Sequence, residues 1–217
     1  RWQEILAPYH QAVEELDLKL NHIKEEYKKR GMYCPMELIT CRVKSITSIL
    51  DKMERKNIPE EKLEELIEDI AGVRIICQFV EDIRKVAEML ERREDLSVIQ
   101  IKDYLNQGAK QSGYRSYHLI AVYTVYTLDG PKEVQVEFQI RTLAMHFWAT
   151  IEHSLQYKYQ NEIPEDVSER LSMTAESLEI LEGEMSAVRK ELMNAQQSEN
   201  YRHLLVSNIL KTIEKLY

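Results

Sequence analysis

The sequence has few of the features on which secreted, membrane-spanning or zinc-binding proteins depend. Its three cysteines, Cys34, Cys41 and Cys77, include no C-x-x-C pair and are odd in number, which argues against a disulfide framework or a zinc site and favours reduced thiols. Apolar runs are far shorter than the roughly 20 residues that cross a bilayer. Because no basic segment leading into an apolar one opens the chain, we expect a cytoplasmic protein with no membrane partner.

An excess of basic residues is also missing. The formal net charge is −8 over 217 residues and the pI is about 5.4, which argues against non-specific binding to nucleic acid or to a membrane surface. Regulation by RNA stays open. The six histidines form neither an H-E-x-x-H motif nor an adjacent His-Asp pair, so a histidine-based metal hydrolase is not indicated. In so acidic a chain, a local cluster of cations is informative.

Residues 134–141 alternate between apolar and polar side chains, which predicts a strand with one buried face. The apolar members are Val134, Val136, Phe138 and Ile140, and the polar members are Gln135, Glu137, Gln139 and Arg141. Such a polar face is most often merely hydrated. Here, however, a carboxylate lies near an arginine, and we expect an aromatic helix over 142–159 to cover them. That arrangement would suit a metal ion and a phosphate.

A helix that begins at Pro35 is predicted to carry a one-sided basic face. From Lys44 onward the spacing of its members is 4, 4 and 3, which places them together. The members are Arg42, Lys44, Ser48, Lys52 and Arg55. A basic helix face is often only a hydrated surface. Since no carboxylates alternate with these cations, the face should attract an anion.

The middle of the chain reads as an alternation of helices and strands. The expected elements are a short acidic helix over 59–68, a buried strand over 70–80, a helix over 81–93, and strands over 97–104, 117–127 and 133–141. Asp129-Gly130 predicts a hairpin between the last two strands. The loop 105–116 contains glycines and cations but lacks the G-K-[ST] ending of a P-loop, so by itself it is a weak phosphate signal.

Two apolar stripes, over 6–27 and 167–192, alternate spacings of three and four residues, which is typical of helix-on-helix seams. The two seams could pair within one chain. A separate final helix over 205–216 would then leave a third apolar face uncovered. Because uncovered apolar faces mark interfaces, we expect a homo-oligomer of closed symmetry with the terminal helices at its contacts.

Two carboxylates, Asp69 and Glu137, lie on separate predicted strands. Taken alone, Asp69 is best explained as a turn cap. Together with the cationic helix before them and the loop between them, however, they make up a set that phosphate chemistry with Mg²⁺ requires. That set contains oxygen ligands for the metal, cations for phosphate charge and planar groups for bases.

Five segments resemble, in order and spacing, the motifs of the RelA/SpoT-type (p)ppGpp synthetases. They read RVKSITSILDK over 42–52, DIAGVR over 69–74, KDY over 102–104, SGYRSYH over 112–118 and EFQIRT over 137–142. The helical flanks and short length resemble the small alarmone synthetases. The His-Asp metal motif that the hydrolase domain of long relatives needs is absent from the sequence.

The resemblance implies transfer of pyrophosphate from ATP to the 3′-hydroxyl of GDP or GTP, with release of AMP. It implies an α+β fold, in which a mixed β-sheet flanked by helices is related to the nucleotidyltransferases. One synthetase domain would cover 1–217, with its core at about 35–160 and helical flanks over 1–34 and 161–217. By the same resemblance the expected oligomer is a homotetramer.

The resemblance also implies residue roles. ATP would be bound by Arg42, Lys44, Ser48, Lys52, Arg55 and Arg74, with Arg42 and Arg74 on either side of the adenine. Asp69 and Glu137 would be catalytic and would hold the cofactor Mg²⁺, and Glu137 is alternatively a general base. The guanine nucleotide would be bound by Lys102, Lys110, Tyr114, His118, Gln139 and Arg141, with Tyr114 stacked on guanine.

Two other kinds of protein would share part of this pattern. A nucleotidyltransferase that transfers NMP would use the same carboxylates but would need no guanine-stacking tyrosine. A non-catalytic module that binds nucleotide or RNA would use the basic helix without needing Asp69 and Glu137 together, and the acidic balance of the chain argues against it.

Overall fold

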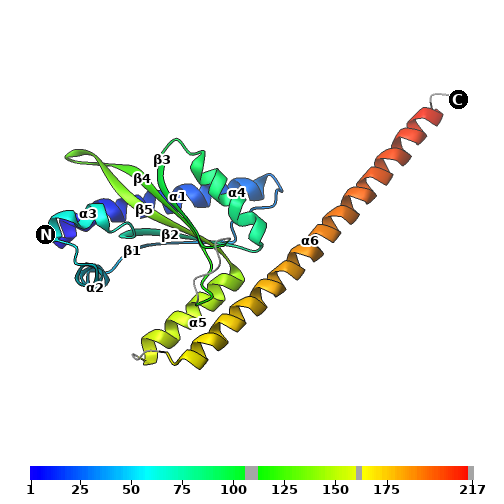
Figure 1. Cartoon of the computed structure of the whole chain (residues 1–217). Helices are drawn as coiled ribbons and strands as arrows, with labels where there is room; N and C mark the ends of the chain where they lie inside the picture. The colour runs from blue at the N-terminus through cyan, green and yellow to red at the C-terminus, as the bar shows by residue number, and fades with distance from the viewer. Residues whose placement is uncertain (106–111, 160–162, 215–217) are drawn as a thin grey trace.

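A computed structural model describes residues 1–105, 112–159 and 163–214 (Figure 1). Its elements in chain order are α1 (Trp2–Lys29), β1 (Leu38–Val43), α2 (Ile46–Lys56), the 3-10 turn η1 (Glu60–Lys62), α3 (Leu63–Leu66), β2 (Ala71–Cys77), α4 (Val80–Glu91), β3 (Leu96–Asp103), β4 (Tyr117–Thr127), β5 (Gly130–Thr142), α5 (Leu143–Tyr159) and α6 (Glu165–Glu214).

The strands form one mixed sheet in the order β1-β2-β5-β4-β3. The β2–β5 pair is parallel and the other three pairs are antiparallel. The predicted hairpin is confirmed, although β5 begins earlier than expected, at Gly130, whose φ of +105° favours glycine. The α+β class with a mixed sheet flanked by helices is therefore confirmed.

Helices α1 and α4 cover the apolar face of the sheet (Figure 1). The buried stripe of α1 consists of Leu6, Pro8, Tyr9, Ala12, Val13, Leu16 and Leu20. The interpretation of this stripe as a helix-on-helix seam, paired with 167–192 or exposed at a subunit contact, is wrong. Pro8 and Ala12 widen the stripe beyond a narrow seam, and a wide stripe suits packing on a sheet.

The helix predicted from Pro35 is also wrong in its first part. Residues 38–43 form an edge strand that pairs antiparallel with β2, so Arg42 lies on a strand and Lys44 in the connection that follows. Helix α2 begins only at Ile46, where the hydroxyl of Ser45 accepts a hydrogen bond from the amide of Ser48. Backbone hydrogen bonds to β2 stabilise residues 38–43 as a strand. The spacing of the cations in the sequence cannot reveal this pairing.

The C-terminal region forms one helix, α6, instead of the two predicted. Its C-terminal half extends away from the sheet (Figure 1). Leu171 and Leu178 pack against Trp148 of α5, whereas the later positions of the predicted seam are 50–63% exposed. These later positions are Leu181, Met185, Val188 and Leu192. Leu205, Ile209 and Ile213, on the face expected to be uncovered in one chain, are also exposed, so the exposed apolar surface of α6 is longer than predicted.

Arg189 makes a second attachment between α6 and the sheet domain. Its guanidinium lies 4.4 Å from the ring centroid of Tyr33 and 4.3 Å from that of Phe79. It also donates to the carboxylate of Asp82, which is fully buried and accepts a further hydrogen bond from the Tyr33 hydroxyl. Pairing with Arg189 offsets the cost of burying Asp82. Because Arg189 lies on α6, these contacts hold the helix in its direction relative to the sheet.

The three cysteines were expected to be reduced and mostly buried thiols. All three cysteines are free, but only Cys77 is buried, while Cys34 and Cys41 are half-buried. Within the described parts of the chain, no helix has both the length and the apolar character needed to cross a membrane. The fifty-residue α6 is thus long but too polar for that role.

We predict that Gly113→Ala destabilises the fold. Gly113 has a φ of +89°, and a Cβ atom there would lie 2.6 Å from the Cβ of Ala175 on α6. Overpacking of this kind costs about 1–3 kcal/mol in unfolding free energy, which urea denaturation would measure. Gly31→Ala is the control, because Gly31 also has a positive φ but a Cβ there would meet nothing within 4 Å. Equal losses in both variants would show that backbone strain alone is responsible.

Candidate active site

The register of the sheet aligns polar residues from all five strands on the face opposite α1 and α4. Thr40, Arg74, Gln139, His118 and Lys102 form one row across β1, β2, β5, β4 and β3. Directly paired residues point to the same side of a sheet. Four of these five residues were predicted to bind substrates, and they come from distant parts of the sequence, so the sheet brings them together as expected.

The neighbouring row contains Arg42, Gly72 and Glu137, on β1, β2 and β5. Gly72 has no side chain, and this leaves an opening between the arginine and the carboxylate. A pocket occupies that opening, lined by Thr40, Cys41, Arg42, Asp69, Gly72, Val73, Arg74, Glu137 and Gln139. No α5 residue lines the pocket, so 142–159 does not cover this part of the polar face; its first turn approaches the face, where His146 lies near enough to Arg141 and Arg74 for burial and their charges to lower its pKa. Instead, α5 packs against α6.

Gln139 connects the charged groups of the face. Its Oε1 atom accepts hydrogen bonds from Arg74 at 3.1 and 3.2 Å and from Arg141 at 2.8 Å, and its Nε2 atom donates to Glu137 at 2.7 Å. On the other side of Glu137, the Nδ1 atom of His118 lies 3.9 Å from the carboxylate. The amide therefore orients both the arginines and the carboxylate.

Positive charge exceeds negative charge at this network. Burial and the nearby Arg141 and Arg42 lower the pKa of Arg74 to about 10. Burial also lowers the pKa of Arg141, whose buried Nε atom has no hydrogen-bond partner among the described residues. Mutually repelling guanidinium groups beside a single carboxylate, Glu137, are suited to an anionic ligand such as a phosphate chain.

Asp69 lies just before β2, where it binds two lysines. Its carboxylate accepts hydrogen bonds from Lys44 at 2.8 Å and from Lys52 at 2.6 Å. Burial alone would raise the pKa of Asp69, but the two lysines outweigh it and the pKa is lowered. Among the described residues, no group of three or more His, Cys, Asp or Glu side chains could hold a metal ion. Any metal here would need further ligands from a substrate or from water.

Aromatic groups gather on the β3–β4 side of Glu137. The hydroxyl of Tyr114 lies 3.2 Å from Nε2 of His118 and accepts a 3.4 Å hydrogen bond from Arg141. The ring of Tyr104 meets the rings of Tyr114 and His118 edge-on, with centroids 6.1 and 5.3 Å apart. No role was predicted for Tyr104. Its place directly after Lys102-Asp103 was the signal available, because a tyrosine that ends a strand beside predicted ligands can reach the same site.

Some predicted residues are more distant from the pocket. Ser48 and Arg55 are exposed on α2 and do not line it, and the Ser48 hydroxyl accepts a hydrogen bond from Ser45. The ammonium group of Lys102 is bonded to Glu68. Lys110 lies outside the described residues. These roles stay predictions.

Comparison with known proteins agrees with the geometry. Residues 41–162 match the family described as the region found in RelA/SpoT proteins. GTP pyrophosphokinase YjbM of Bacillus subtilis is 51% identical over 196 residues, which cover 90% of this chain and 92% of that protein.

Solved structures extend the similarity to the fold. The structure of small alarmone synthetase 1 from Bacillus subtilis bound to its product pppGpp aligns with a TM-score of 0.84 and 52% identity, covering 88% of this chain and 97% of that one. The structure of the same enzyme bound to AMPCPP aligns with a TM-score of 0.77 and 48% identity, covering 89% and 98%. The chain therefore belongs to the RelA/SpoT family.

Proposed function

We propose that the protein synthesises (p)ppGpp by transferring pyrophosphate from ATP to the 3′-hydroxyl of GDP or GTP. The observation that carries this proposal is the position of Glu137 on the central strand β5. Arginines on β1 and β2 lie on one side of it, and His118 and Lys102 on β4 and β3 lie on the other. One nucleotide on each side would meet at the carboxylate.

The β1–β2 side suits ATP. Arg42 and Arg74 border the same pocket, where planar guanidinium groups can stack on both faces of an adenine. Lys44 and Lys52 meet at Asp69 and would contact the phosphates, with Ser48 and Arg55 farther along α2. The relative solved with AMPCPP, which carries an adenine and a phosphate chain, supports an adenine nucleotide in the family's site.

The β4–β3 side suits the guanine nucleotide. Tyr114 would stack on the base, as aromatic side chains do in other nucleotide sites. His118, Lys102 and Lys110 would contact the ribose and acceptor phosphates, while Gln139 and Arg141 support the strand face. The relative solved with pppGpp supports a guanine nucleotide in the family's site.

The proposed reaction takes place between the two nucleotides, one from each side of Glu137. The guanosine O3′ atom attacks the β-phosphorus of ATP, and the bond from that phosphorus to the oxygen of the α-phosphate breaks, so AMP leaves with the bonding electrons. The proton of the 3′-hydroxyl is lost, and Glu137 is placed to accept it. The arginines beside Gln139 stabilise the negative charge that develops on the transferred group.

The donor set also fits Mg²⁺. This ion is usually held by one or two carboxylates together with substrate phosphates, and Asp69 and Glu137 line one pocket. When bound, Mg²⁺ would neutralise charge on the transferred phosphates. Lys44 and Lys52 would then exchange Asp69 for phosphate oxygens. Whether Glu137 serves as a ligand or a base stays open.

The product distinguishes this reaction from NMP transfer. The protein would be incubated with ATP, Mg²⁺ and either GDP or GTP, and the nucleotides separated. Formation of a guanosine 3′-diphosphate together with AMP is expected. Release of inorganic pyrophosphate from ATP, with no new guanosine species, would instead identify a nucleotidyltransferase.

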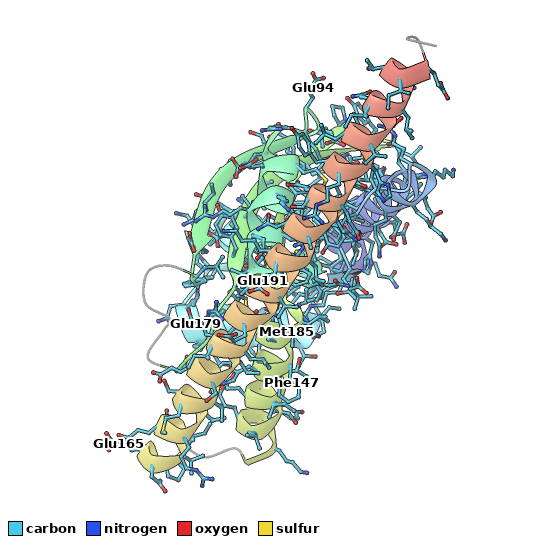
Figure 2. All side chains as sticks on the ribbon, turned by 90° about the vertical axis from the view of Figure 1, so that its right-hand side faces the viewer. Glu94, Phe147, Glu165, Glu179, Met185 and Glu191 are labelled. Atoms are coloured by element: carbon cyan, nitrogen blue, oxygen red, sulfur yellow. The ribbon has the colours of Figure 1, made fainter. Side chains whose placement is uncertain are left out.

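We predict that the protein self-associates through the exposed apolar face of α6, into the homotetramer that the family resemblance implies. On that face Leu181, Met185 and Val188 are at least half exposed, and Phe147 on α5 is 61% exposed (Figure 2). Exposed apolar side chains that gather on one surface in this way mark an interface. Light scattering should give a multiple of the 25.7 kDa chain mass. A mass of one chain at micromolar concentration would refute the prediction.

We predict that Glu137→Gln lowers kcat by about a hundredfold or more while the protein remains folded, because the amide keeps the shape but can neither accept a proton nor bind a metal strongly. Steady-state kinetics and a melting curve would measure both effects. Glu133→Gln is the matched control, since Glu133 lies four residues before Glu137 on the same strand and is exposed. Wild-type turnover by a folded Glu137→Gln variant would exclude the catalytic role.

We predict that Gly72→Val raises KM for ATP by roughly tenfold, which corresponds to about 1.4 kcal/mol of binding free energy. A Cβ atom at Gly72 meets only ordinary contacts, 3.8 Å from the carbonyl oxygen of Arg42, so the fold should tolerate it. The added methyl groups would extend into the pocket. Gly183→Ala on α6 is the control. An unchanged KM for ATP would place the adenine elsewhere.

A further inference from the structure

Helix α6 contributes very few buried residues to the fold. Of its fifty residues only Ala175 and Glu182 are buried, and one of these two is a carboxylate. Burial of a charged group is costly unless the group is paired and fully hydrogen-bonded. The partners of Glu182 therefore show what the helix holds in place.

Both oxygen atoms of Glu182 are engaged. Its Oε2 atom accepts a 2.6 Å hydrogen bond from Arg115, and its Oε1 atom accepts one from the hydroxyl of Thr142. Arg115 and Thr142 are themselves buried. Arg115 directly follows Tyr114, and Thr142 directly follows Arg141. One carboxylate on α6 thus joins the two segments that carry the Tyr114–Arg141 contact of the active site.

Packing supports the same connection. Tyr114 packs against the cluster formed by Trp148 and Ala175. Gly113 passes so close to Ala175 that a side chain there would collide with it. Figure 2 shows this part of α6, marked by Glu179 and Met185, beside α5 with its labelled Phe147. Helix α6 therefore forms the support behind the tyrosine.

We propose that Glu182 is a positioning residue for the guanine nucleotide. Through Arg115 and Thr142 it fixes the loop end at 113–116 and the end of β5, and so holds Tyr114 and Arg141 in the orientation that binds the base. Glu182 itself does not touch the substrate. This inference rests on the proposed synthesis of (p)ppGpp, because it assigns the Tyr114 side of the site to GDP or GTP.

The test is Glu182→Gln, which keeps the shape and a hydrogen-bond acceptor but removes the charge that strengthens both bonds. We expect KM for GDP and GTP to rise about tenfold while KM for ATP changes by less than about twofold, a pattern that indicates lost binding of one substrate. Tyr114→Ala would give the reference effect of losing the ring. Melting curves would confirm that the variants are folded.

Glu179→Gln is the matched control. Glu179 lies on the same helix and approaches the same guanidinium, at 3.8 Å from Arg115, but it is 60% exposed. Its loss should leave both KM values unchanged, because exposed ion pairs contribute little.

A second variant tests the proposal if Glu182→Gln fails to fold. If Glu182→Gln is unstable, the double variant Arg115→Met, Glu182→Leu removes both buried charges. Proteins usually tolerate the replacement of a buried ion pair by apolar residues. Because the Thr142 hydroxyl then loses its acceptor and Arg115, next to Tyr114, is replaced, KM for the guanine nucleotide should still rise.

The outcomes separate this inference from the function on which it rests. Wild-type protein that forms no guanosine 3′-diphosphate would overturn the proposed function. Active wild type, together with a folded Glu182→Gln variant whose KM for GDP and GTP is unchanged, would overturn the positioning role. Equal rises in KM for ATP and the guanine nucleotide would also overturn it, since they would indicate a general loss of structure.

Discussion

The parallel pairing of β2 with β5 is the contact on which the site depends. It places Gly72 beside Glu137 and Arg74 beside Gln139, so the opening lies next to the carboxylate and the arginine next to the amide that orients it. A slip of one residue would turn every polar side chain of one strand toward the core. Burial of Val73, Phe138 and their neighbours prevents such a slip, so core packing itself aligns the site.

That alignment carries an electrostatic cost. The guanidinium groups of half-buried Arg74 and buried Arg141 repel one another, and their pKa values are lowered. Both guanidinium groups donate to the neutral amide of Gln139, and Arg141 also donates to the hydroxyl of Tyr114. A phosphate chain would relieve this repulsion, so the arrangement of charges favours an anionic substrate.

Helix α6 contacts the rest of the chain through Leu171, Ala175 and Leu178 in its first part, and through the charged residues Glu182 and Arg189 farther along. Ala175, Glu182 and Arg189 recur every seven residues on one face, and each contacts the folded core. The apolar positions Leu181, Met185 and Val188 lie on a different face and remain exposed. The helix can therefore dock within one chain and still offer an apolar surface to another.

The polar strand at 134–141, the hairpin and the five ordered motifs could be predicted from the sequence, because alternation, turn residues and motif spacing are local patterns. The sequence misplaced Arg42 and Lys44 on a helix, because helical spacing is visible locally whereas the pairing of 38–43 with β2 is not. No local pattern distinguishes Glu182 from the many other carboxylates of α6. Only the tertiary structure could decide these points, because strand pairing and the burial of a charge depend on residues distant in the chain.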